Sequence, residues 1–205
     1  MSVMDQRSLE EMIKKETGGN PVRAFVSVEL PEDIKIRILA ENSSLNMKGA
    51  RLVSEDQLHI TLFFFEKIDN EKLIAVITLF ELLKQKKFDI AVEGLGIFEP
   101  RHPRIIYANV KDNGVLADIY KRLKDQIASL GIEVEEREYT PHVTIARVKG
   151  ADKPTEVKLN EFVSTHRSNN YGGFTCGEIK IIKSELTDKG PVYTELYTKR
   201  LSESA

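Results

Sequence analysis

The sequence HITL at residues 59–62 has a counterpart, HVTI, at residues 142–145. Alternate residues of an extended strand point to the same face, so each copy places an imidazole beside a hydroxyl and directs its apolar residues to the core. If the two strands lie opposite each other, two histidines and two threonines converge on one cleft. Imidazoles that titrate near neutral pH and hydroxyls that donate hydrogen bonds suit a site for a phosphate ester.

Apolar periodicity predicts strands and helices on both sides of the two motifs. The expected strands cover residues 22–30, 51–53, 58–65, 88–98, 104–111, 142–148, 174–186 and 192–201, and the expected helices begin at residue 31 or cover 69–85 and 116–130. Residues 132–138 indicate an acidic strand or sheet edge, and residues 149–170 show no clear pattern. Hairpins without regular βαβ alternation predict an α+β fold with largely antiparallel sheets. We expect a bilobal, duplicated fold with pseudo-twofold symmetry around a central cleft.

Length and composition set the domain organisation and the cellular setting. Residues 1–21 form a polar N-terminal extension, with a capping box at Ser8 and a stop at Gly18, and residues 22–201 form a single bilobal domain. A formal net charge of -2 indicates no global basic field, so an anionic ligand must be held by local groups. One cysteine, Cys176, and the lack of a long apolar stretch indicate a soluble, cytoplasmic protein that makes no membrane contact. We expect a monomer.

Four further segments flank the motifs: RAFVSVELPED at residues 23–33, PRIIYANV at 103–110, EYTPHVTIARV at 138–148 and SELTDKGPVYTEL at 184–196. Together with the paired HxTx motifs, they resemble the two-histidine (2H) phosphoesterases. Within these, the segments look like the RNA 2′,3′-cyclic phosphodiesterase branch, also called LigT-like or 2′-5′ RNA ligase. The resemblance covers about residues 22–201, which is nearly the whole chain.

The resemblance implies hydrolysis of an RNA 2′,3′-cyclic phosphate end to a 2′-phosphomonoester, without a metal or another cofactor. It makes His59 the proton donor to the 3′ oxygen and His142 the acceptor that activates water, while Thr61 and Thr144 bind the phosphate. From the residues alone, the pseudo-symmetry leaves the acid and base assignment open. The implied partner is RNA with a cyclic phosphate terminus, tRNA fragments among the candidates, or a nucleotide. Ligation of 2′-5′ ends would be the reverse reaction at the same site.

Two positions after the motifs raise geometric questions. Arg147 matches an arginine that follows the second motif in the family and would bind the phosphate. Its odd offset from His142 places it on the opposite face of a regular strand, so either a bulge re-aims it or it braces the strand from behind. In the family pattern HxTLKFLG, Phe63 stands where lysine is common and Glu66 where glycine is common. By parity Phe63 shares the face of His59, where it would stack on a base or pack.

Three alternatives remain open at this point. The two motif histidines could bind a metal with His102 or His166 as a third ligand, although no carboxylate or cysteine stands at a recognisable ligand spacing. The chain could be a nucleotide- or RNA-binding module that does not turn over. It could also apply the same chemistry to 2′,5′-linked oligonucleotides or small nucleotide cyclic phosphates.

Overall fold

The computed structural model describes residues 5–42, 45, 47, 49–136, 138–188 and 190–203. The strands within these residues are β1 (Val22–Glu29), β2 (Ala50–Leu52), β3 (His59–Ile68), β4 (Phe88–Phe98), β5 (Ile105–Lys111), β6 (His142–Val148), β7 (Asn170–Cys176), β8 (Glu178–Thr187) and β9 (Gly190–Arg200). The helices are α1 (Gln6–Thr17), α2 (Glu32–Asn42), α3 (Asn70–Leu82), α4 (Val115–Ser129) and α5 (Lys153–Thr165), with a short 3₁₀ turn, η1 (Glu55–Gln57).

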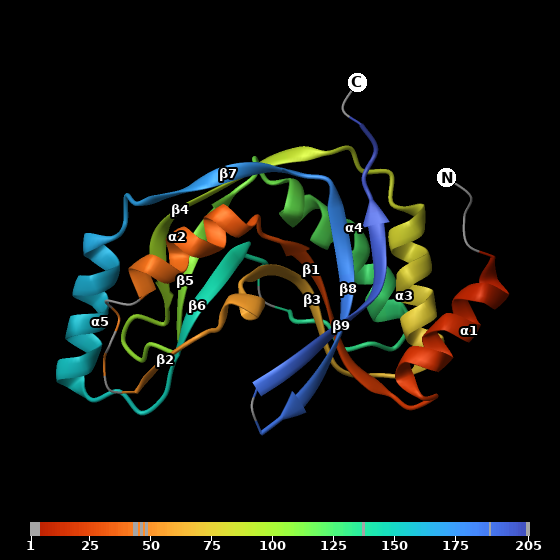
Figure 1. The fold of residues 1–205 in the computed structure, drawn as a ribbon, viewed down its shortest axis with the longest axis horizontal. Helices are drawn as coiled ribbons and strands as arrows, with labels where there is room; N and C mark the ends of the chain where they lie inside the picture. Colours follow the sequence, from red (N-terminus) through yellow and green to blue (C-terminus); the bar gives the residue numbers. More distant parts are fainter. Residues whose placement is uncertain are drawn as a thin grey trace.

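All nine described strands belong to one curved sheet in the order β7-β4-β5-β6-β3-β1-β8-β9, with β2 added beside β6. Every pairing between these strands is antiparallel. Figure 1 shows the two halves spreading to either side of β3 and β6, with α5 at one end and α1 and α3 at the other. The predicted α+β class and the antiparallel arrangement are confirmed.

The two halves of the sheet join where the motif strands meet. β3 and β6 pair through Ile60 and Val143, the apolar residues at the centres of the two motifs. Both side chains are fully buried. Because the apolar face of each motif anchors this junction, the opposite face of each motif is left to line a cleft.

Helices cover the sheet through their apolar faces. α2 packs against β7, α5 against β4, α3 against β9 and α4 against β3. In α3 the buried stripe has the spacing of an amphipathic helix, and Asp69 caps its start by accepting a hydrogen bond from the backbone of Lys72. Among the described residues, no helix is both long and apolar enough to cross a membrane.

Three segments differ from the sequence-based expectation. Residues 149–170 contain α5, a helix begun by Asp152 at its N-cap and by a proline in its first turn. The strand expected at 174–186 is divided at Gly177, so that β7 pairs with β4 while β8 pairs with β1 in the other half. Residues 132–136 and 138 form no strand, although Glu133, Glu135 and Glu138 line a pocket.

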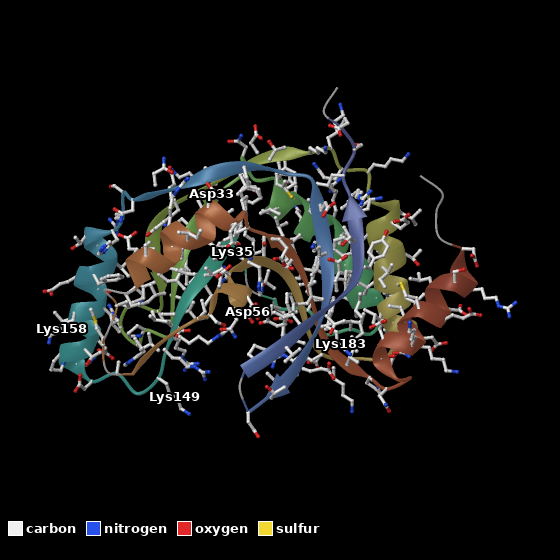
Figure 2. The ribbon with its side chains drawn as sticks, viewed as in Figure 1. Asp33, Lys35, Asp56, Lys149, Lys158 and Lys183 are labelled. Carbon is white, nitrogen blue, oxygen red and sulfur yellow. The ribbon has the colours of Figure 1, made fainter. Side chains whose placement is uncertain are left out.

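The N-terminal helix α1 packs against α3 and buries Leu9 and Ile13. Asp5, rather than Ser8, is its N-cap, and Gly18 ends it in the left-handed conformation with φ 63°. Lys183, labelled in Figure 2, donates a hydrogen bond to the carbonyl oxygen of Glu16 at 2.8 Å and ties the end of α1 to β8. The boundary between an extension and a domain at residues 21 and 22 stays a prediction, and residues 1–4 lie outside the described part.

Candidate active site

The two motif strands lie side by side at the junction of the sheet. Because β3 and β6 are antiparallel and centred on Ile60 and Val143, each motif's histidine lies across from the other motif's threonine. Two adjoining pockets open on this face, and both are lined by Thr61 and Thr144. The structure therefore brings together the four residues that the duplicated motif predicted.

We name the two pockets after their histidines. The His59 pocket, of about 90 Å³, is also lined by Arg23, Gln57, Ser184 and Tyr193. The larger His142 pocket, of about 290 Å³, has three glutamates and several aromatic side chains in its walls. Phe64 and Arg147 line both pockets and thus stand at their shared boundary. No carboxylate among the described residues lines the His59 pocket, so the two pockets differ in charge.

A bulge in β6 places Arg147 in the cleft. Tyr107 of β5 pairs with Thr144, whereas the next residue, Ile106, pairs with Ala146, so β6 carries one extra residue between them. An extra residue reverses the alternation of side chains beyond it. Of the two expectations for Arg147, the bulge that re-aims the side chain into the cleft is the one that the structure shows.

The same irregularity in β3 brings Phe64 to the boundary of the two pockets and turns Phe63 toward the core. Ser27 of β1 pairs with Thr61, whereas the next residue toward the start of β1, Val26, pairs with Phe63. Phe63 is 3% exposed and stacks on Tyr120 with ring centroids 4.7 Å apart, while Phe64 is 44% exposed. The expectation that Phe63 shares the face of His59 is therefore wrong. Phe64 follows His59 by five residues, as Arg147 follows His142, so the two side chains occupy equivalent positions in the two halves of the sheet.

His59 is enclosed by aromatic rings and kept neutral. Phe25 stacks on it with centroids 4.7 Å apart and planes 14° apart, and Tyr193 approaches edge-on at 5.9 Å. Burial, followed by the positive charges of Lys35 and Arg147, lowers the pKa of His59 to about 4. Lys35, on α2, is labelled near the middle of Figure 2. The imidazole of His59 is thus uncharged near neutral pH in the free protein.

His142 is held in one tautomer. Its Nδ1 lies 2.7 Å from the carbonyl oxygen of Thr140, and since a carbonyl can only accept, Nδ1 carries the hydrogen. Phe98 and Tyr107 meet the ring edge-on, with centroids 5.0 and 5.4 Å away. Proton transfer at His142 therefore belongs to Nε2.

Tyr139, which precedes the second motif, supports the first. Its hydroxyl donates a hydrogen bond to the carbonyl oxygen of Thr61 at 3.0 Å, and its ring stacks on Tyr120. Burial raises the pKa of Tyr139, so that the phenol stays protonated. This contact joins the loop before β6 to β3 and holds the two motifs together.

The remaining histidines lie outside both pockets. His102 is exposed and lies 3.6 Å from Glu156, and His166 lies 3.2 Å from Glu41. Among the residues that the structure describes, no three potential metal ligands gather in one place. The metal alternative, which needed His102 or His166 as a third ligand, gains no support from this placement.

Most of the side chains around His59 belong to no motif that the sequence shows. Arg23 and Tyr193 lie within two of the segments that carried the family resemblance, but neither has a motif of its own. Ser184 is 5% exposed and lines the His59 pocket from β8, directly opposite Tyr193 of β9. Their proximity depends on the pairing of β1 with β8 and of β8 with β9, which local periodicity does not reveal.

The low pKa of His59 predicts an acid-sensitive contribution to stability. Its pKa is about 4 when folded and 6.5 for an ordinary solvated histidine, so the unfolded chain binds the proton first as pH falls. The free energy of unfolding should drop through this window by on the order of 3 kcal/mol from His59 alone. In His59→Gln the loss between these pH values should be smaller than in the wild type, as measured by urea unfolding. An identical pH dependence in both proteins would contradict it.

A comparison with protein families matches residues 34–188 to the 2′-5′ RNA ligase superfamily. A relative from Methanocaldococcus jannaschii, named RNA 2′,3′-cyclic phosphodiesterase, is 34% identical over 173 residues, which cover 84% of this chain and 96% of the relative. A protein of the same name from Methanothermobacter thermautotrophicus is 31% identical over 185 residues, covering 88% and 99%.

Solved structures show the same fold. A protein from Thermus thermophilus matches with a TM-score of 0.73 at 24% identity, covering 89% of this chain and 100% of its own. E. coli LigT complexed with 3′-AMP matches with a TM-score of 0.74 at 22% identity, covering 90% and 100%. The chain therefore belongs to the 2′-5′ RNA ligase superfamily of two-histidine phosphoesterases, and within it to the RNA 2′,3′-cyclic phosphodiesterase family.

Proposed function

We propose that the protein hydrolyses RNA 2′,3′-cyclic phosphodiester ends to 2′-phosphomonoesters without a metal ion. The observation that carries this proposal is the convergence of two HxT motifs on one cleft, each histidine across from the other threonine. The activity named for several relatives of 30% identity or more supports the same reaction. His59 and His142 are the proposed acid–base pair, and Thr61, Thr144 and Arg147 the proposed phosphate contacts.

The reaction needs two proton transfers, one at each histidine. A neutral imidazole takes a proton from water while the water oxygen bonds to phosphorus. The bond from phosphorus to the ribose 3′ oxygen breaks, and a protonated imidazole gives its proton to that oxygen. The threonine hydroxyls and Arg147 stabilise the negative charge that grows on the non-bridging oxygens. Each turnover exchanges the charge states of the two histidines, and exchange with solvent restores them.

The two histidines divide these roles in one of two ways. The family resemblance makes His59 the donor, and a bound phosphate anion would raise the pKa of His59 toward the charged form that this role requires. The opposite assignment, with His59 as acceptor and Nε2 of His142 as donor, is favoured by the pKa of about 4 in the free protein. We propose the first assignment, and a substrate whose leaving group needs no proton separates the two.

The pockets also suit the two parts of the proposed substrate. The small His59 pocket, without carboxylates among its described lining residues, fits a compact anion, and the larger His142 pocket offers Phe98 and Tyr139 as apolar walls for a nucleoside. The LigT structures complexed with 3′-AMP and with ATP support a nucleotide or an RNA end as the ligand. We propose a cytoplasmic location, which the one buried cysteine without a disulfide supports, and a monomeric state. Ligation of 2′-5′ ends would use the same residues in reverse.

Product analysis tests the proposed function directly. An oligoribonucleotide that ends in a 2′,3′-cyclic phosphate is incubated with the protein in excess EDTA, and the terminal phosphate is identified by mass spectrometry and phosphatase mapping. A 2′-phosphate supports the proposal. A 3′-phosphate, or loss of activity on chelation, contradicts it, and binding without product supports the non-catalytic alternative. A 2′,5′-linked oligonucleotide and a nucleoside cyclic phosphate, assayed in parallel, separate the substrate alternatives.

Removal of either motif hydroxyl should slow the reaction without unfolding the protein. In Thr61→Val and Thr144→Val, one hydrogen bond to a charged oxygen is lost, and we expect kcat to fall by about tenfold each. The exposed Thr175, which hydrogen-bonds to Asp89 on β4, provides a matched control in Thr175→Val. Unchanged kcat in both motif variants would remove the threonines from the phosphate site.

A further inference from the structure

The first motif strand, β3, contributes no arginine or lysine to the lining of either pocket, but the neighbouring strand β1 contributes Arg23. The bulges bring Arg147 and Phe64 to equivalent positions, so that the second motif strand contributes a guanidinium and the first an aromatic ring. Arg23, from the neighbouring strand β1, lies over this ring with its guanidinium carbon 4.7 Å from the ring centroid. Cation–π contact at this distance holds the guanidinium in place.

The surroundings of Arg23 leave its charge unmatched. Its Nε is buried and has no hydrogen-bond partner among the described residues. Neither Arg23 nor Arg147 forms an ion pair with a described residue, and no described carboxylate lines the His59 pocket that they share. A buried N–H donor without a partner is costly, and the planar fork of guanidinium N–H donors matches the oxygens of a phosphate.

The acidic residues gather on the other side of the boundary. Glu133, Glu135 and Glu138 line the His142 pocket and are absent from the His59 pocket. An anion in the shared cleft is therefore repelled from the His142 pocket and attracted to the His59 pocket. Arg23 and the boundary residue Arg147 line the His59 pocket together with His59 and both threonines, and they form a compact site for an anion.

We propose that Arg23 is a second cationic contact for the substrate phosphate, held by Phe64 and acting from the side opposite Arg147. This inference rests on the proposed function in one respect, namely that the anion is the phosphate of the ester that is cleaved. Arg23 binds and orients this group, while the proton transfers remain with the two histidines. A residue that only packed on Phe64 would contribute to stability but not to anion affinity.

Inorganic phosphate is the probe for this role, because its binding does not require turnover. Its affinity is measured by isothermal titration calorimetry for the wild type, Arg23→Met, Arg23→Lys and the control Arg200→Met. Arg200 lies at the far end of β9, exposed and near Glu178, and lines neither pocket. We expect Arg23→Met to weaken phosphate binding by about tenfold or more, and Arg200→Met to leave it unchanged.

Arg23→Lys keeps the positive charge and most of the aliphatic side chain. It therefore tests the role of Arg23 even if Arg23→Met fails to fold. Because an ammonium lacks the planar fork, we expect it to recover part of the lost affinity but not all of it. Wild-type affinity in Arg23→Met, or no phosphate binding by the wild type, would overturn the proposal. If phosphate binding depends on Arg23 while cyclic ends are not cleaved, the proposed function fails, and Arg23 remains an anion contact for a ligand other than the cyclic ester.

Discussion

His142→Ala is expected to lower kcat on a 2′,3′-cyclic phosphate end by about 10²–10⁴-fold, and His59→Ala by a similar factor, because each removes one of two proton transfers. The folds of both variants should persist. Both rings lie on the cleft face of their strands, whereas the neighbouring Ile60 and Val143 anchor the junction of the sheet from the buried side. Single-turnover measurements with the RNA end at saturating protein separate the chemical step from binding.

His102→Ala is the matched control. His102 is exposed, lies near Glu156 and lines neither of the two pockets, so we expect wild-type kcat. Full activity in either motif variant would contradict the acid–base pair. A drop in His102→Ala as large as in the motif variants would show that the loss is not specific to the site.

The two motif variants also distinguish donor from acceptor. A p-nitrophenyl phosphodiester releases a leaving group that needs no proton, so a variant that lacks only the donor should retain most of its activity on this substrate. We expect His59→Ala to be rescued in this way and His142→Ala not. Rescue of His142→Ala alone would reverse the two roles and would agree with the neutral state of His59 in the free protein.

Local sequence pattern correctly predicted the two motif strands and the face on which their histidines and threonines lie. Alternation placed His59 and Thr61 on one face, and repetition in the second half placed His142 and Thr144 on an equivalent one. The structure brings these four residues to one cleft because their apolar neighbours pair at the junction of the sheet. Duplication was informative here because each copy predicted the geometry of the other.

Regular alternation predicted the wrong face for the side chains beyond the third residue of each motif. The bulges at Leu62 and Ile145 shift every later side chain to the other face, so Phe64 and Arg147 enter the cleft and Phe63 enters the core. A bulge is set by pairing with a neighbouring strand, and the apolar run from Leu62 to Phe65 contains no residue type that marks the extra position in β3. Arg23 was not predicted either, because it reaches the site from a neighbouring strand that is distant in sequence.

Arg147→Met should change both the rate and its pH dependence. Loss of a charged contact to the phosphate should lower kcat/KM by about tenfold to a hundredfold. The pH profile of kcat/KM reports the ionisations of the free protein, and its acidic limb should lie near the pKa of His59, about 4. Because the positive charge of Arg147 helps to lower this pKa, its removal should shift the acidic limb to higher pH.

The direction of that shift does not depend on which histidine is the donor. The productive state carries one proton on the pair of imidazoles, so the profile falls below the lower pKa under either assignment. Arg200→Met, which leaves the cleft intact, should keep the wild-type profile. The pKa of His59 followed by NMR in Arg147→Met gives an independent measurement, and a value unchanged or lower than in the wild type would show that the arginine does not face this imidazole. A raised pKa together with an unchanged rate would instead place Arg147 near His59 but away from the phosphate.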